Sequence, residues 1–206
     1  MASCRILTDG VPSSNSLRDY IMTDYQKIID KYYPAESLGR VIYMKHCRAV
    51  ADLSLQIASS LSLPIARSDI EAAAMLHDIG ICHTDAPDIG CLGSLPYICH
   101  GIEGAAILRG EGAPEEWARV AERHTGAGIT AAEVVAQQLP LPKVDYMPET
   151  PLERLICYAD KFYSKSGDMK RKPLERVIAS MERISPSTLS RFLALHAEFN
   201  KAQPTT

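Results

Sequence analysis

The chain has 206 residues, of which 46% are apolar and 23% are charged, and its formal net charge is −3. This composition is ordinary for a globular protein and excludes a disordered, collagen-like or coiled-coil chain. A chain of this length buries enough surface to form a core without stabilising disulfides. The weak negative charge gives no general attraction to nucleic acid or anionic lipid, so we expect neither extended nucleic acid nor a membrane as a partner.

The sequence shows no sign of a membrane span or a secretion signal. No apolar run approaches the ~18 residues that a membrane helix requires, and the first sixteen residues lack the apolar segment of a signal peptide. The six cysteines form no Cys-x-x-Cys pair, so we interpret them as free thiols in a reducing compartment. We therefore expect the protein to be cytoplasmic.

The spacing of apolar residues predicts helices along most of the chain. Residues 1–15 are polar and rich in turn formers, so we expect a flexible arm there and a short tail at 201–206. Helical spacing is found in the segments 16–33, 38–61, 68–80, 100–109, 114–124, 130–139, 151–165, 173–184 and 187–200. No segment alternates as a strand does. The sequence therefore predicts an all-α fold, with one domain at 16–200.

Several residues mark the expected ends of these helices. Residues 68–69 offer an N-cap, Pro114 suits a first helical position, and Thr130 is a further N-cap. Gly80 is expected in the left-handed conformation that ends a helix. Residues 81–99 have no stable period and contain two prolines and two glycines, so we interpret them as a candidate lid.

Histidines and aspartates stand within or at the ends of apolar helices. His77 and Asp78 close the segment EAAAMLHDIG, while His46 and Asp160 lie in the middle of predicted helices. Burial of such groups without partners is costly, and shared ligation of a metal ion removes that cost. The pattern predicts a metal site whose candidate ligands are His46, His77, Asp78, His100, His124 and Asp160.

The order His46, His77-Asp78 and Asp160 resembles the HD-domain superfamily of metal-dependent phosphohydrolases, in the HDIG subtype. The His-x-x-x-Gly-Ala segment at 100–105 and the Arg-His-Thr-Gly segment at 123–126 are similar to the branch that holds two metals. Residues 122–161 further resemble a little-characterised HDIG family of small stand-alone proteins. The resemblance covers residues 38–166 and implies a single HD-domain helical bundle.

Within this resemblance, the six candidate ligands divide into two sets that share one residue. We hypothesise a first metal held by His46, His77, Asp78 and Asp160, and a second held by Asp78, His100 and His124. Asp78 is the bridge because a carboxylate has two oxygens, whereas an imidazole cannot bridge two cations. The mixed nitrogen and oxygen ligands suit iron, manganese, nickel or zinc, so we expect one or two divalent transition metal ions as the cofactor.

Two cationic side chains adjoin the candidate ligands. Arg123 precedes His124, and Lys161 follows Asp160. Either cation could neutralise a phosphate, and the resemblance favours this role for one of them. Members of the family often carry a lysine directly after the HDIG motif, where this chain has Ile81.

The remaining polar groups are assigned ordinary structural roles. The basic run from Lys165 to Lys172 could guide an anionic substrate, but we interpret it as a solvated helix end. His83 is expected in solvent, and His196 is expected as a core or surface histidine. A separate zinc site around Cys82 and its neighbouring cysteines is disfavoured by irregular spacing.

These residues predict hydrolysis of a phosphate ester or anhydride. The expected substrate is a small phosphate compound, a nucleotide or a nucleotide derivative, attacked by a hydroxide that bridges the metals, with Asp78, Lys161 and Arg123 as catalytic residues. Two alternatives stay open. Di-iron oxygenases of the same superfamily share the ligand order, and a non-catalytic sensor would keep the helical bundle without turnover.

Overall fold

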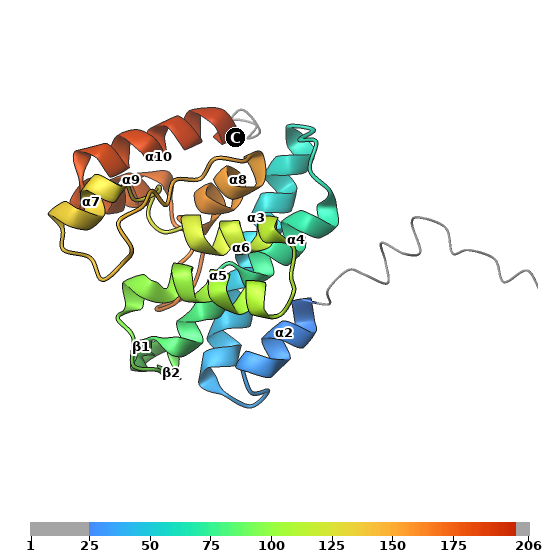
Figure 1. Ribbon diagram of the computed structural model, residues 1–206. Helices are drawn as coiled ribbons and strands as arrows, with labels where there is room; N and C mark the ends of the chain where they lie inside the picture. Colours follow the sequence, from blue (N-terminus) through green and yellow to red (C-terminus); the bar gives the residue numbers. More distant parts are fainter. Residues whose placement is uncertain (1–24, 201–206) are drawn as a thin grey trace, which may run out of the picture.

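The computed structural model describes residues 25–200, most of which lie in helices and the turns that join them (Figure 1). The expected arm at 1–15, the first part of the helix expected from residue 16, and the tail at 201–206 lie outside the described residues. The fold class is all-α, as predicted. The α-helices are α2 (Tyr25–Tyr32), α3 (Leu38–Ser60), α4 (Arg67–Leu76), α5 (His100–Gly110), α6 (Glu115–Arg123), α7 (Ala131–Ala136), α8 (Pro151–Asp160), α9 (Leu174–Ile184) and α10 (Pro186–Phe199).

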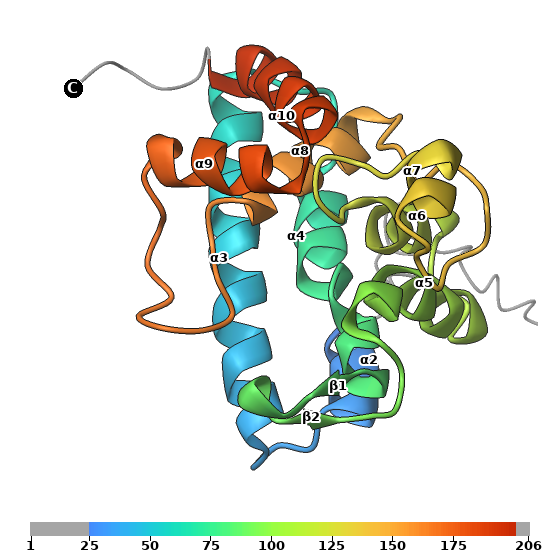
Figure 2. The ribbon, with the colours of Figure 1, turned by 90° about the vertical axis from the view of Figure 1, so that its left-hand side faces the viewer.

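Helix α4 lies at the centre of the described part of the chain. It packs against α2, α3, α6 and α8, and its residues Ile70 and 72–76 are all buried. The sequence explains this position, because the second half of the helix, residues 72–76, is apolar on every side and such a segment must be buried. Its three consecutive alanines also let neighbouring helices approach closely. Figure 2 shows the long helix α3 running beside α4 through much of the molecule.

The helix starts follow the capping residues that the sequence offers, with two corrections. Thr130 caps α7 and Thr150 caps α8, each through a capping box with a glutamate three residues on. Helix α4 begins at Arg67 after Ala66, so the N-cap expected at 68–69 is wrong. Pro114 precedes the first residue of α6 and does not occupy it.

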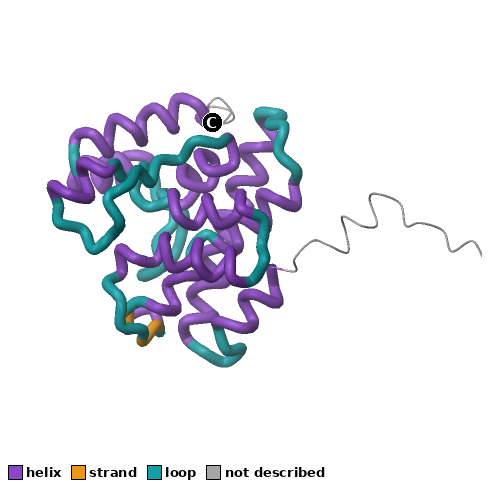
Figure 3. Tube along the Cα trace, viewed as in Figure 1, coloured by secondary structure: helices purple, strands orange, loops and turns teal. Residues whose placement is uncertain are grey.

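The segment 81–99 is irregular, as predicted, but it is internally hydrogen-bonded. It contains the 3₁₀ turns η1 (Ile79–His83), η2 (Pro87–Ile89) and η3 (Tyr97–Cys99). Two strands of two residues each, β1 (Asp85–Ala86) and β2 (Cys91–Leu92), form the small antiparallel hairpin that Figure 3 shows in orange. Strands this short carry no alternation, so the sequence pattern could not reveal them.

Gly80 serves a different purpose from the one expected. It does not take the left-handed conformation, since the glycines with positive φ are those at 90, 112, 126, 128 and 167. A Cβ atom at residue 80 would lie 2.3 Å from both the amide nitrogen of Gly104 and the carbonyl oxygen of His100. Glycine is required because η1 and α5 are in backbone contact at this point.

No helix within residues 25–200 combines the length and the apolar character that crossing a lipid bilayer demands.

Candidate metal centre

Five helical elements bring the six candidate ligands to one place. His46 lies in the middle of α3, whereas the other five stand at helix ends. His77 and Asp78 directly follow α4, and Asp160 is the last residue of α8. His100 opens α5 and His124 directly follows α6. All six side chains are buried.

The ligand atoms form two groups that share Asp78. The first group contains His46, His77, Asp78 and Asp160, and the second contains Asp78, His100 and His124; within each group the ligand atoms lie within 4.8 Å of one another. These are the two sets that the sequence predicts. The structure brings them together, and metal ligation by them is our proposal.

The two oxygens of Asp78 face different groups. Oδ2 lies 3.1 Å from Nε2 of His46 and 3.0 Å from Nε2 of His77. Oδ1 lies 3.3 Å from Nε2 of His124 and 3.7 Å from Nε2 of His100. On the far side of the first group, Oδ1 of Asp160 lies 3.1 Å from Nε2 of His46. The geometry is that of a carboxylate able to bridge two cations.

Three of the four histidines are oriented by the same local contact. Nδ1 of His77 lies 2.7 Å from the carbonyl oxygen of the residue three positions earlier, and the corresponding distances are 2.7 Å for His100 and 2.8 Å for His124. Each Nδ1–H thus donates to a main-chain carbonyl at a helical turn. In the neutral ring this contact leaves the lone pair on Nε2, which is the atom that faces the cluster.

The cluster contains buried polar atoms that a cation would satisfy. Nε2 of His46 and Nε2 of His77 are 3.3 Å apart, and Nε2 of His100 and Nε2 of His124 are 3.1 Å apart. Facing lone pairs repel unless a proton or a cation lies between them. Oδ1 of Asp78 and Nδ1 of His46 are buried without a hydrogen-bond partner among residues 25–200. The residues present therefore fit a pair of metal ions.

The electrostatics keep most ligands in the state that binds metal. Burial raises the pKa of Asp78, but His77 and Lys165 outweigh it and hold that pKa well below its usual range. Burial lowers the pKa of His100 to about 3 and also lowers that of His124. Both imidazoles are therefore neutral at neutral pH. Burial lowers the pKa of His77 too, but Asp78 outweighs it and raises that pKa well above normal, so metal binding at His77 would release a proton.

Lys165 lies beside the candidate ligands, although it is not among the site residues predicted from the sequence. Its Nζ lies 2.7 Å from Oδ2 of Asp78, and its side chain is 18% exposed, so it is not the solvated cation expected. The chain turns back after α8, where the amide of Tyr163 donates to the carbonyl of Asp160 at 3.1 Å. The turn brings the lysine back to the cluster. The sequence did offer a signal for this position, because the lysine follows the candidate ligand Asp160 by only five residues. The basic residues after it made the whole run look like a solvated helix end.

Lys161 and Arg123, the two cations expected to contact phosphate, have other partners. Nζ of Lys161 donates to Oδ2 of Asp160 at 2.5 Å and to the carbonyl of His124 at 2.8 Å. This ammonium therefore positions one ligand and ties α8 to the end of α6. Arg123 donates to the carbonyl of Met147 at 2.9 Å and pairs with Glu149 at 3.1 Å. These contacts direct its guanidinium to residues 137–150, the crossing that joins α7 to α8.

The other histidines lie outside both ligand groups. His83 is exposed, as expected, and pairs with Glu103 at 3.2 Å. His196 is half-buried on α10 and contacts the hydroxyl of Tyr158. Cys82 belongs to neither of the ligand groups found within residues 25–200.

Comparisons with known proteins show the family to which the chain belongs. A family model described as HD domain matches residues 43–164. A tRNA (cytidine(56)-2'-O)-methyltransferase of Picrophilus torridus is 35% identical over 133 residues, which are 65% of this chain and 35% of that protein. The enzyme of the same name from Thermoplasma volcanium is 32% identical over 167 residues, which are 81% of this chain and 44% of that protein.

A third relative is matched over most of its length. An uncharacterized protein of Methanocaldococcus jannaschii is 32% identical over 163 residues, which are 76% of this chain and 87% of that protein. The match spans less than half the length of each methyltransferase. No solved structure matches the chain significantly.

Proposed function

The chain belongs to the HD-domain family, and from that membership we propose that it is a metal-dependent phosphohydrolase acting on a phosphate ester or anhydride of a nucleotide or nucleotide-derived compound. The family supports the metal-dependent hydrolase class. The observation that carries the proposal is the position of Asp78, whose two oxygens face two separate histidine pairs.

The two ligand groups would hold two divalent metal ions. When bound, such a pair of cations would lower the pKa of a coordinated water and would stabilise negative charge on a phosphoryl oxygen. The chain's own contribution is to fix the ligands before any substrate arrives. Main-chain carbonyls orient His77, His100 and His124, and Lys161 holds one oxygen of Asp160.

Lys165 is the cation that we assign to the substrate phosphate. Its ammonium is the charged group next to Asp78 that is not tied to a main-chain carbonyl, and it retains some exposure. A lysine is a compact, mobile charge with three donors. It can therefore leave its ion pair with Asp78 and donate to a phosphate oxygen. Lys161 is a positioning residue in this proposal, and Arg123 supports the fold of the 137–150 crossing.

The named relatives support a substrate of the nucleotide class. Two of them are named as enzymes that methylate the 2'-oxygen of cytidine 56 in tRNA. This chain matches 35% and 44% of those proteins, so the shared segment is part of a longer protein that acts on RNA. The candidate metal centre lies within the HD match, and we therefore assign hydrolysis, and not methyl transfer, to this chain.

Metal analysis combined with a phosphate-release screen tests the proposal. Protein purified without oxygen and loaded with Mn²⁺, Fe²⁺ or Ni²⁺ is expected to bind two metals per chain and to release phosphate from a panel of nucleotides and dinucleotides. Asp78→Ala should lose both metals, and His124→Ala should lose one. His83→Ala removes a histidine outside the cluster and should retain both metals, which makes it the matched control.

Two results would contradict the proposal. Retention of two metals by Asp78→Ala would show that the residue does not bridge the two groups. Consumption of oxygen, with no phosphate released from any compound of the panel, would assign the centre to the oxygenases that share this ligand order.

A further inference from the structure

One aromatic side chain beside the candidate metal centre is exposed. Tyr97 is the first residue of η3, and 41% of its surface is accessible. Every other Phe, Trp or Tyr within residues 25–200 is buried or half-buried. The ring centre of Tyr97 lies 4.8 Å from that of the candidate ligand His100, and the two ring planes are inclined by 33°. An exposed aromatic ring next to the metal ligands is therefore accessible to a substrate.

The backbone around Tyr97 is fixed by hydrogen bonds. The carbonyl of Tyr97 accepts the bond from Nδ1 of His100 at 2.7 Å. Two residues earlier, the amide of Leu95 donates to the carbonyl of His83 at 3.2 Å, and the carbonyl of Leu95 accepts from the amide of Asp85 at 2.8 Å. These bonds set the position of Tyr97 relative to the candidate ligands before any substrate binds.

The hydroxyl of Tyr97 lies next to Lys165, although the ring is exposed. Burial of the hydroxyl end raises the pKa of Tyr97 to about 12, while Lys165 opposes the rise by its charge and by contact between the two side chains. The phenol is therefore a neutral donor at neutral pH. The ammonium of Lys165 lies 2.7 Å from Oδ2 of Asp78, so the hydroxyl borders the place that we assign to the substrate phosphate.

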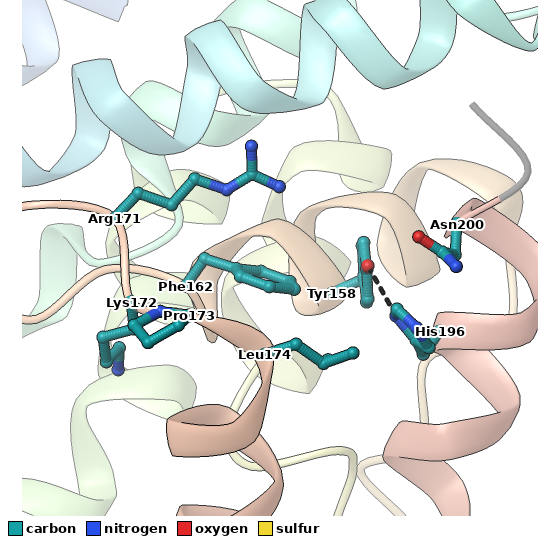
Figure 4. A pocket seen from close by; sticks show the side chains of 8 residues that line it. All are labelled: Tyr158, Phe162, Arg171, Lys172, Pro173, Leu174, His196 and Asn200. Carbon is teal, nitrogen blue, oxygen red and sulfur yellow. Dashed lines mark hydrogen bonds between the residues drawn. The ribbon is translucent and has the colours of Figure 1, made fainter. Parts of the chain in front are cut away.

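The aromatic residues near the end of α8 offer no such surface. Figure 4 shows Tyr158 and Phe162 among the residues that line a cavity between α8, α9 and α10. Their exposed fractions are only 2% and 3%. The rings of Phe192 and Phe199 pack on Tyr158, with ring centres 5.8 Å and 5.5 Å away. A flat ligand can therefore stack on Tyr97 and not on these rings.

We infer that Tyr97 is the residue by which the metal centre recognises a nucleotide, its ring stacking on the base and its hydroxyl donating to the phosphate beside Lys165. The phosphate contact rests on the proposed function, whereas the base contact is measurable without turnover. Aromatic rings that carry a polar group at one edge suit a ligand that is flat at one end and polar at the other. A phosphate compound without a flat ring would lose the stacking contact, so Tyr97 would select nucleotides over sugar phosphates.

Calorimetric titrations of the full chain loaded with Mn²⁺ test the two contacts separately. Adenosine carries the base without a phosphate, inorganic phosphate lacks the base, and neither is hydrolysed by a phosphohydrolase. Tyr97→Leu is expected to weaken adenosine binding about fivefold or more, because stacking on the ring is lost. Tyr97→Phe keeps the ring and should leave adenosine binding unchanged. Both variants should weaken phosphate binding about threefold, because a neutral hydrogen bond is lost.

Two further variants serve as controls. Lys165→Gln should weaken phosphate binding about tenfold, because a charge-assisted hydrogen bond is lost, and should leave adenosine binding unchanged. Tyr25→Leu removes a half-buried tyrosine of α2 whose hydroxyl donates to Glu71 at 3.1 Å, and it should change neither affinity. Tyr97→Leu should keep the metal content of the unmodified chain, because the bond to His100 is made by the main-chain carbonyl, which leucine retains.

Each contrary outcome is decisive. Equal adenosine affinities of Tyr97→Leu and the unmodified chain, or no binding at millimolar adenosine, would overturn the base contact. An unchanged phosphate affinity of Tyr97→Phe would overturn the phosphate contact. Loss of a metal ion from Tyr97→Leu would make the ring a support for His100 and overturn the inference. The proposed function is judged by the metal content and phosphate release of the unmodified chain, which the adenosine titrations do not measure.

Discussion

Replacing Gly80 by alanine would place a methyl group between η1 and the first turn of α5. The new Cβ would lie 2.3 Å from the amide nitrogen of Gly104 and from the carbonyl oxygen of His100, whereas ordinary Cβ contacts begin at 3.4 Å. Both obstacles are backbone atoms, so no side chain can rotate away. The two segments must separate by about 1 Å.

This separation is expected to affect both stability and metal binding. Overpacking of a core costs typically 1–3 kcal/mol, and we take about 3 because the clash is with backbone on both sides. At roughly 2–4 °C per kcal/mol for a chain of this size, Tm should fall by about 6–12 °C. Metal–ligand distances tolerate only about 0.2 Å. Moving His100 away from Asp78 should therefore remove one metal ion per chain.

Thermal unfolding and metal analysis of Gly80→Ala, compared with Gly110→Ala, provide the assay. Gly110 is the last residue of the same helix and a Cβ there meets nothing within 4 Å, so its replacement should leave Tm unchanged or raise it slightly. If the two variants had the same Tm and the same metal content, the backbone contact at Gly80 would not position His100.

Three further results are expected. Lys165→Gln should raise KM for the phosphate substrate about tenfold or more, because one charge-assisted hydrogen bond is lost. The metal content should stay the same. An unchanged KM in steady-state assays would contradict the assigned role. Burial raises the pKa of Glu133, but hydrogen bonds from Thr130 and Arg191 lower it to about 2. The free energy of unfolding should therefore fall as pH drops from about 4.5 toward 2. In urea titrations, Glu133→Gln should lose this part of the pH dependence. If the free energy of unfolding changed with pH equally in both proteins, Glu133 would not be its source. Chelation of the metal-loaded protein should lower Tm by several degrees. Ions that bind only the native state stabilise it by about 2.7 kcal/mol when their free concentration is a hundred times Kd. A Tm that is insensitive to EDTA would show that the ligands are not occupied by metal.

The fold class could be predicted from the sequence because helices give a local signal, and the six candidate ligands could be predicted because their combined order resembles that of the HD-domain superfamily. Helical spacing is visible within each segment, and a histidine such as His46 inside an apolar helix is rare enough to require a partner. The same signals fail where a contact is made across the fold. Gly80 has no local requirement for glycine, and its role is set by the approach of α5.

Lys165 shows the same limit for the candidate site. It lies past the end of α8, which stops at Asp160 and not near residue 165 as expected. In a continuous helix the lysine would point away from Asp160, because five residues turn the helix by about 500°. The reversal at Tyr163 depends on packing and is not encoded in helical periodicity, so the lysine was assigned to solvent.

The distribution of the ligands along the chain also bears on how the centre would be assembled during translation. The group formed by Asp78, His100 and His124 is complete once residue 124 has been synthesised, while the other group waits for Asp160 on α8. Lys161 nevertheless ties the carbonyl of His124 to the end of α8. Both proposed sites would therefore take their final shape only after α8 has packed against α6.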